Sequence, residues 1–149
     1  MVADCETLIQ NVDFPIVSTD FCLEFTGISD PMKAFQELSN SFQGFWVMTC
    51  GAKGAVVSIG GKCMVFPGLK VDAVDTTGAG DIFHGAFLYG LLKNWTLRRI
   101  MAFSNAASGL SCEYLGAQSG IRPLEEIMRC AEIRSLVSYC TYKSESRGL

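Results

Sequence analysis

The sequence has little charge, few prolines and a single histidine. Charged side chains make up 18% of its 149 residues, and 12 basic against 15 acidic residues leave a net charge of −3. Domains that bind nucleic acid carry a clustered excess of Lys and Arg, so this balance excludes nucleic acid from the expected partners. Hydrophobic residues account for 49% of the chain, which excludes a disordered protein. The length allows one domain, and the low charge indicates that much of its surface is buried.

The sequence also lacks zinc-binding, secretory and membrane-spanning patterns. None of its seven cysteines forms a C-x-x-C pair, so no zinc site is expected. The first 20 residues contain Asp4, Glu6, Asp13 and Asp20 but no Lys or Arg, the reverse of a signal peptide. The longest apolar run, residues 82–92, has 11 residues, whereas a membrane-spanning helix needs about 20. We therefore expect a soluble cytoplasmic protein with reduced thiols and no membrane partner.

The order of strand and helix signals predicts an α/β fold with a mostly parallel central sheet flanked by helices. The predicted strands are short and rich in β-forming residues: 11–19, 45–49, 55–59, 62–66 and 71–74. The predicted helices begin at capping or proline signals or after a glycine-rich turn: 31–41 with Asp30 as N-cap, 82–92, 96–113, and one after Pro123. Residues 1–142 are expected to belong to one domain and residues 143–149 to form a frayed tail.

Residues 75–81, DTTGAGD, are the segment that predicts chemistry. They follow a predicted strand and lead directly into the apolar segment 82–92, which we expect to be a buried helix. A helix N-terminus has about four backbone N–H groups without an intrahelical partner and carries roughly half a positive charge. Gly78 and Gly80 remove side chains that would keep an anion away from those N–H groups. The pattern predicts a phosphate site that is formed by backbone, without a lysine.

Asp81, at the end of this segment, has two interpretations that the residues leave open. Its carboxylate can simply interact favourably with the dipole of the following helix. It can also act as a general base on a hydroxyl that attacks a bound phosphate, a role worth about 10²–10⁴-fold in rate. A Walker A ATPase is excluded because G-x-x-x-x-G-K-[ST] is absent, and a dinucleotide-binding loop is disfavoured because Phe83 replaces its third glycine.

Residues 74–87, VDTTGAGDIFHGAF, resemble the C-terminal signature of the ribokinase-like (PfkB) carbohydrate kinase family. Three further segments resemble the family in the same order along the chain. Residues 49–55, TCGAKGA, are similar to its strand and turn near the nucleotide, and residues 104–108, SNAAS, to its helix beside the adenine. Gly116-Ala117 resembles the loop that closes the adenine pocket. The similarity runs from about residue 12 to residue 127.

The resemblance implies a kinase that transfers a phosphoryl group from Mg-ATP to a hydroxyl of a sugar or nucleoside. It implies that Asp81 is the catalytic base and that the backbone of Gly78, Ala79 and Gly80 forms an anion hole. The implied nucleotide site comprises Thr49, Gly51, Gly54, Thr77, Asn105, Gly116 and Ala117. In potassium-activated members, the positions of Asp75 and Thr77 help to hold K⁺.

The sequence departs from the family in two respects. It matches only the C-terminal half of family members, so we expect a ribokinase-like fold truncated on its N-terminal side. The N-x-x-E motif that organises Mg²⁺ is replaced by Ser18-Thr19-Asp20-Phe21. A non-catalytic ribokinase-like nucleotide-binding or scaffolding protein therefore stays as an alternative to the kinase, and a dinucleotide-binding domain ranks third. An exposed sheet edge would favour pairing with another chain, as a homodimer or with a different partner.

Overall fold

The computed structural model describes residues 2–135 and 140–142. The chain divides into two compact units. Unit 1 comprises Met1–Cys50, Val56–Val65 and Cys140–Leu149, and unit 2 comprises Gly51–Ala55 and Phe66–Tyr139. The frayed tail expected at residues 143–149 lies outside the described residues. We describe each unit by itself.

The helices of unit 1 are α1 (Val2–Ile9), α2 (Thr19–Thr26) and α3 (Pro31–Ser41). The prediction for α3 is confirmed, because Asp30 accepts a hydrogen bond from the Lys33 N–H at 2.9 Å and Pro31 occupies the first turn. The sequence did not predict α1 or α2. Ser18 starts α2 by accepting a hydrogen bond from the Phe21 N–H at 3.1 Å, so the chain passes directly from β1 (Ile16–Ser18) into a helix.

A five-stranded sheet has the order β1-β2-β3-β4-β5. Its strands are β1 (Ile16–Ser18), β2 (Val47–Thr49), β3 (Gly54–Ile59), β4 (Lys62–Pro67) and β5 (Cys140–Tyr142). β1 and β2 are parallel, whereas β4 and β5 are antiparallel. The sheet is therefore mixed, and the expectation of a mostly parallel sheet was wrong.

The physical reason is the hairpin at Gly60-Gly61. The neighbouring strands β3 and β4 are joined by these two residues alone, and both have positive φ, 55° and 73°. Two positive φ values in a row are typical of a type I′ hairpin turn. A parallel connection needs a crossover of a dozen or more residues, so this pair can only be antiparallel.

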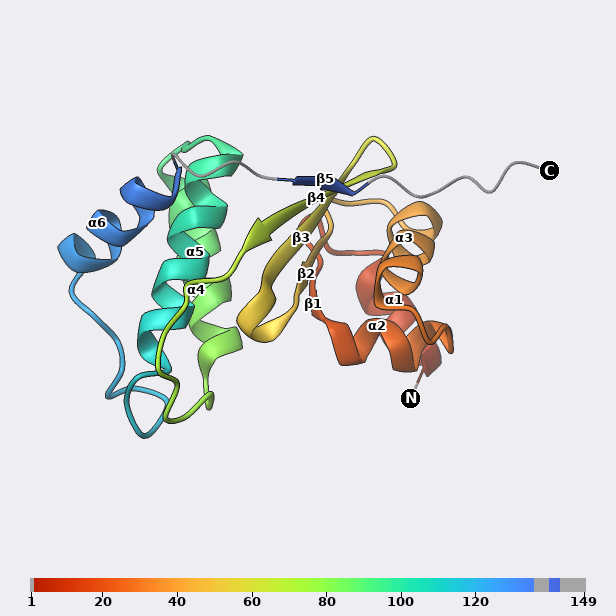
Figure 1. Ribbon diagram of the computed structural model, residues 1–149. Helices are drawn as coiled ribbons and strands as arrows, with labels where there is room; N and C mark the ends of the chain where they lie inside the picture. Colours follow the sequence, from red (N-terminus) through yellow and green to blue (C-terminus); the bar gives the residue numbers. More distant parts are fainter. Residues whose placement is uncertain (1, 136–139, 143–149) are drawn as a thin grey trace. The chain divides into compact units, whose positions relative to one another are not determined.

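One hydrophobic core holds unit 1 together. Phe35 and Leu38 on α3 and Trp46 before β2 are almost completely buried, together with Cys22 on α2 and Cys63 on β4. The Trp46 indole N–H donates to the Phe42 carbonyl at 3.1 Å, which satisfies its polar atom inside the core. The helices thus pack against one side of the sheet within this unit (Figure 1).

Unit 2 contains α4 (Ala79–Leu92), α5 (Leu97–Ser111), α6 (Leu124–Ser135) and the short 3₁₀ turn Gly51–Lys53. α4 and α5 are antiparallel neighbours, and α6 packs on α5 (Figure 1). A Cβ at Gly90 of α4 would lie 2.8 Å from Cγ1 of Ile100 on α5, so glycine allows the helices to approach closely. Their interface is rich in alanine, with Ala86, Ala102 and Ala106 in its core. The predicted helices 96–113 and after Pro123 are confirmed.

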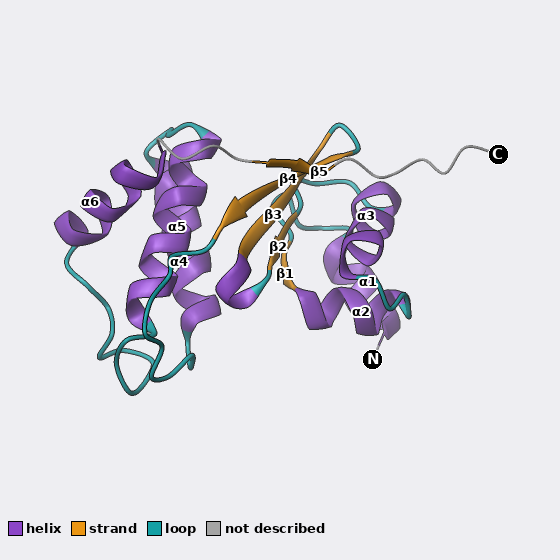
Figure 2. Ribbon diagram, in the orientation of Figure 1, coloured by secondary structure: helices purple, strands orange, loops and turns teal. Residues whose placement is uncertain are grey.

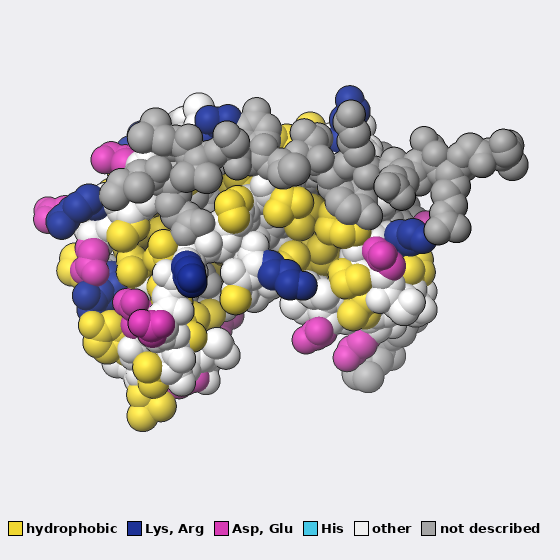
Figure 3. Space-filling model, viewed as in Figure 1, with side chains coloured by type: hydrophobic (Ala, Val, Ile, Leu, Met, Phe, Trp, Pro, Cys, Tyr) yellow, Lys and Arg dark blue, Asp and Glu magenta, His cyan; other side chains and the backbone are white. Residues whose placement is uncertain are grey.

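Two expectations for the segment around α4 were wrong. Residues 71–74 form no strand, because the N–H groups of Val74 and Asp75 both donate to the Cys112 carbonyl, at 2.7 and 3.1 Å. The helix is buried on one side only, with Leu88 and Leu92 52% and 82% exposed on the other. Hydrophobic side chains are also visible on the face shown in Figure 3.

Of the helices in the described residues, none has the length and apolarity required to cross a membrane.

We predict that Asp30→Ala lowers the free energy of unfolding by about 1 kcal/mol, because the Lys33 N–H loses its capping acceptor. Urea denaturation measures the effect. Asp30→Ser is the control, because serine also caps helices well. Its free energy of unfolding is expected to lie within about 0.5 kcal/mol of the wild-type value. Equal loss in both variants would show that the cap does not stabilise α3.

Candidate phosphate-binding site

The site predicted from residues 75–81 lies at the start of α4. Gly78 is the N-cap residue and has φ +78°, in the left-handed region that favours glycine. A Cβ at Gly78 would lie 2.8 Å from the Cβ of Ala117, so the loop after α5 contacts the backbone at this point. The Ala79 N–H donates to the Thr76 carbonyl at 3.1 Å, and the Ile82 N–H donates to the Gly78 carbonyl at 3.0 Å. The backbone conformation and the contact with Ala117 thus both require glycine at position 78.

Gly80 lies in the first turn of α4, and the structure gives no such reason for it. Its φ is not positive, and a Cβ built on it would meet nothing within 4 Å. Glycine in a helix costs roughly 0.5–1 kcal/mol relative to alanine. Among the described residues, the N–H groups of Gly80 and Asp81 have no hydrogen-bond acceptor, as expected for the first turn of a helix. Open space beside two unused donors fits an anion that would occupy the place of the side chain.

Asp75 connects the loop before α4 to the loop after α5. One carboxylate oxygen, Oδ1, accepts from the Thr77 N–H at 2.9 Å and from the Thr77 hydroxyl at 2.7 Å. The other, Oδ2, accepts from the Gly116 N–H at 2.8 Å. The pKa of the Asp75 carboxyl is lowered because the Thr77 N–H, the Gly116 N–H and the Thr77 hydroxyl all favour its charged form. Figure 2 shows the two loops at the same end of the α4–α5 pair.

Asp81, the proposed base, is the third residue of α4 and is exposed. Among the described residues, no hydrogen-bond donor contacts its carboxylate, and α4 has no side-chain cap. The carboxylate is therefore available to a ligand bound at the helix start. The alternative role, interaction with the helix dipole, needs no ligand and stays open.

α5 contributes two side chains that support this end of unit 2. The Ser108 hydroxyl donates to the Ala79 carbonyl at 2.9 Å and so ties α5 to the start of α4. Asn105 is 6% exposed, and its amide donates to the carbonyls of Phe66 and Pro67 at 3.1 and 3.4 Å. Its amide thus holds the end of β4. The sequence analysis did not single out Ser108, although it is the last residue of the SNAAS segment.

The two glycines expected to border the nucleotide also serve the backbone. Gly51 and Gly54 have φ of 55° and 97°. A Cβ at Gly54 would collide with the Phe66 carbonyl and the Gly68 N–H, and the Gly68 N–H donates to the Lys53 carbonyl at 3.1 Å. Thr49 belongs to unit 1, where its hydroxyl donates to the Val17 carbonyl at 3.3 Å.

The structure thus brings together one set of predicted site residues within unit 2: Asp75, Thr77, Gly78, Ala79, Gly80, Asp81, Gly116 and Ala117. For the described part of the chain, no group of three or more His, Cys, Asp or Glu side chains is arranged to hold a metal ion.

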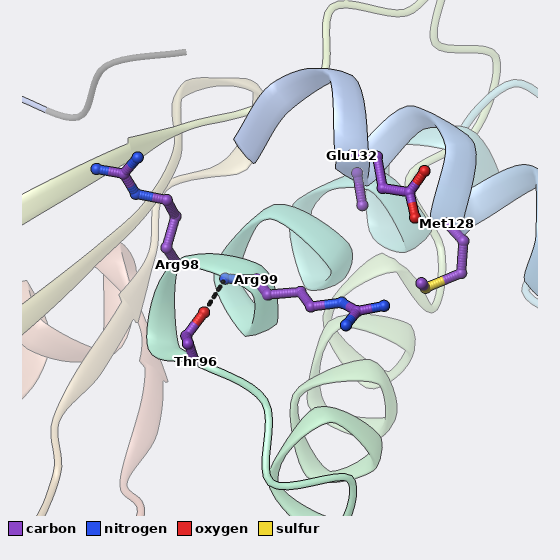
Figure 4. Close-up of a pocket in the computed structure, with 6 residues that line it drawn as sticks. Thr96, Arg98, Arg99, Met128 and Glu132 are labelled. Atoms are coloured by element: carbon purple, nitrogen blue, oxygen red, sulfur yellow. Dashed lines mark hydrogen bonds between the residues drawn. The ribbon is translucent and has the colours of Figure 1, made fainter. Parts of the chain in front are cut away.

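A pocket of about 370 Å³ lies elsewhere in unit 2, at the N-terminal end of α5 (Figure 4). In this view Arg99 extends toward Met128 and Glu132 on α6, and Arg98 points the other way. The Arg99 guanidinium carbon lies 4.2 Å from the centre of the Trp95 ring. α5 has 15 residues and is therefore about 22 Å long, which separates this pocket from the Gly78–Ala117 contact at its other end.

Comparisons with known proteins identify the family of the chain. Residues 2–123 match the sequence profile described as "pfkB family carbohydrate kinase". The chain is 32% identical over 120 residues to a ribokinase of Lactococcus lactis, which covers 80% of this chain and 39% of that protein. It is 30% identical over 131 residues to an ATP-dependent 6-phosphofructokinase of Thermoanaerobacterium thermosaccharolyticum, covering 88% of this chain and 41% of that protein.

A solved structure extends the similarity to the fold. The crystal structure of a ribokinase from Thermotoga maritima matches with a TM-score of 0.76 and 30% identity, over 85% of this chain and 44% of that one. This match confirms the ribokinase-like fold that the sequence predicted. The chain spans about two fifths of the length of the two relatives above.

We predict that alanine has opposite effects at the two glycines of the GAG segment. Gly78→Ala should lower the free energy of unfolding by about 1–2 kcal/mol for its left-handed backbone, and by more through the contact with Ala117. Gly80→Ala should raise it, by about 0.5 kcal/mol, because it gains helix propensity without a clash. Urea denaturation of the two variants measures both signs. Destabilisation of similar size at Gly80 would contradict the open space described here.

Proposed function

The chain belongs to the pfkB family of carbohydrate kinases, and we propose that it acts in ATP-dependent phosphoryl transfer to a hydroxyl group of a sugar or sugar-like alcohol. The observation that carries this proposal is Gly80. Gly80 leaves open space beside two N–H groups in the first turn of α4 that have no acceptor among the described residues. A terminal phosphate of a nucleotide is the ligand that this arrangement suits.

We propose that the N–H groups at the start of α4 bind the γ-phosphoryl group. They are fixed in direction by the helix, so they need no rearrangement when negative charge moves onto the transferred group. The positive end of the helix dipole acts in the same sense. Gly78, Ala79 and Gly80 form the proposed anion hole, in which the Gly80 N–H lies beside open space and the Ala79 N–H also donates to the Thr76 carbonyl.

We propose that Asp81 is the general base. In the step, the acceptor oxygen forms a bond to the γ-phosphorus and its proton passes to the Asp81 carboxylate. The bond between the γ-phosphorus and the bridging oxygen breaks, and its electron pair leaves with ADP. The absence of a competing donor to Asp81 among the described residues supports this role, because a base must offer a lone pair to the substrate.

Mg²⁺ and K⁺ belong to the proposal as partners of the nucleotide. Mg²⁺ would neutralise charge on the phosphates when Mg-ATP binds. The Asp75 carboxylate and the oxygens of Thr77 are hard donors that fit an alkali cation, although Asp75 already accepts three hydrogen bonds. Gly51, Gly54 and Asn105, which belong to unit 2, are the proposed surroundings of the rest of the nucleotide.

The two relatives named above are a ribokinase and a 6-phosphofructokinase, so family membership alone does not choose the acceptor. We propose that residues 1–142 form the C-terminal part of a PfkB domain. A second candidate function is nucleotide binding or scaffolding without turnover. It is favoured by residues 18–21, Ser-Thr-Asp-Phe, which stand in place of the N-x-x-E motif that organises Mg²⁺. Under either candidate, pairing with a second chain is proposed.

We predict that Gly80→Val abolishes ATP binding in the presence of Mg²⁺, because the branched side chain would occupy the space beside the Gly80 N–H. Isothermal titration calorimetry measures the affinity. Gly85→Val is the matched control, since Gly85 lies on the same helix, is exposed and has no neighbour within 4 Å of a built Cβ. Retained binding in Gly80→Val, or equal loss in the control, would remove the start of α4 from the proposal.

We predict that Asp81→Asn reduces the turnover rate by at least 10²-fold and leaves ATP affinity within about threefold, because asparagine cannot accept the proton. A coupled assay of ADP release over a panel of sugars and nucleosides measures turnover. If the wild type binds ATP and turns over no acceptor, the second candidate function is supported instead. If Asp81→Asn turns over at the wild-type rate, Asp81 is not the base.

A further inference from the structure

We propose that Asp75 is a positioning residue, whose carboxylate sets the direction of the phosphate-binding N–H groups by tying the loop before α4 to the loop after α5. This inference rests on the proposed function. It differs from a role for Asp75 as a cation ligand, because it assigns the residue a task in hydrogen bonding between two protein loops.

The contacts of Asp75 carry the inference. Its two oxygens accept three hydrogen bonds of 2.7 to 2.9 Å. Two of the donors belong to Thr77, one residue before the N-cap of α4. The third is the N–H of Gly116, 41 residues further along the chain. One side chain therefore bonds both to the entry of the helix and to a distant loop.

The loop between Asp75 and α4 has few other supports. It contains no strand, and upstream the N–H groups of Val74 and Asp75 donate to the Cys112 carbonyl. On its far side, Gly78 lies against Ala117, next to the residue that Asp75 binds. A shift of the Gly116 loop would therefore be transmitted to Gly78, which begins the helix. A misplacement of about 1 Å at a reacting group can cost 10²-fold in rate.

Substitutions at Asp75 and Thr77 remove different members of this set of three hydrogen bonds. In Asp75→Asn, one oxygen becomes an NH₂ group that cannot accept from an N–H. Either Gly116 or Thr77 then loses its acceptor and faces a second donor. Thr77→Val removes the hydroxyl donor, keeps the N–H donor and leaves the charge of Asp75 unchanged.

The sign of the expected effect distinguishes positioning from simple charge. Replacing a carboxylate by an amide near an anion removes a repulsion, so by charge alone Asp75→Asn would strengthen ATP binding. If Asp75 positions the N–H groups, Asp75→Asn should instead weaken ATP binding. Asp72→Asn is the matched control, because Asp72 is an exposed carboxylate three residues upstream, and its substitution changes the net charge by the same amount.

The experiment measures the affinities of the purified chain for ATP and AMP by calorimetry, at constant Mg²⁺ and KCl. AMP lacks the β- and γ-phosphates and reports on the remainder of the site. We expect Asp75→Asn to weaken ATP binding at least 10-fold and AMP binding less than twofold. Thr77→Val should weaken ATP binding to a smaller degree, and Asp72→Asn should stay within twofold of the wild type. Amide hydrogen exchange at Gly116 should accelerate in Asp75→Asn.

Two results would overturn the inference while the proposed function stands. ATP binding in Asp75→Asn as tight as in the wild type would show that the tie does not position the donors. An equal loss of ATP and AMP affinity would show that Asp75 supports only folding. If Asp75→Asn does not fold, Thr77→Val serves as the test instead. A folded wild type that binds neither nucleotide would instead refute the proposed function, and the positioning role with it.

Discussion

The candidate phosphate site in unit 2 depends on the close approach of two loops that are about 40 residues apart in sequence. Gly78 and Ala117 pack together only because Gly78 has no side chain and holds a left-handed φ. The Asp75 carboxylate spans the same junction through the Gly116 N–H. From this junction α4 begins, and with it the direction of every N–H group in its first turn. The site thus depends on tertiary contact, although residues 75–81, which supply most of it, are contiguous in sequence.

Local chemistry made part of this structure predictable. Asp30 followed by Pro31 starts α3, and Gly60-Gly61 makes a hairpin turn. In both cases the residues that select the conformation lie within four positions of the element that they control. The same holds for residues 75–81, where glycine, a following apolar helix and a first-turn carboxylate suffice to predict an anion site. The family resemblance added ATP and a hydroxyl acceptor, which the residues alone do not specify.

Long-range contacts explain what could not be predicted. Residues 71–74 have β-forming side chains, but their end bonds to the Cys112 carbonyl, which no local pattern reveals. The sheet was expected to be mostly parallel because strands and helices alternate, yet the Gly60-Gly61 turn outweighs that rule for its own pair. Asn105 lies in a segment that resembles an adenine-side helix, and its amide nevertheless bonds to the end of β4.

The glycines of this protein separate two reasons for keeping the residue. Gly54 and Gly78 have positive φ, and a Cβ on either would meet neighbouring atoms of the chain, so the fold alone requires them. Gly80 has neither property, and in the folded chain it lowers helix stability without compensation. Gly85 of the same helix also has open space, so what distinguishes Gly80 is its place in the first turn, beside N–H groups without an acceptor among the described residues. Of the two glycines in the GAG segment, Gly78 is thus required by the fold, and Gly80 is the one that we propose for binding.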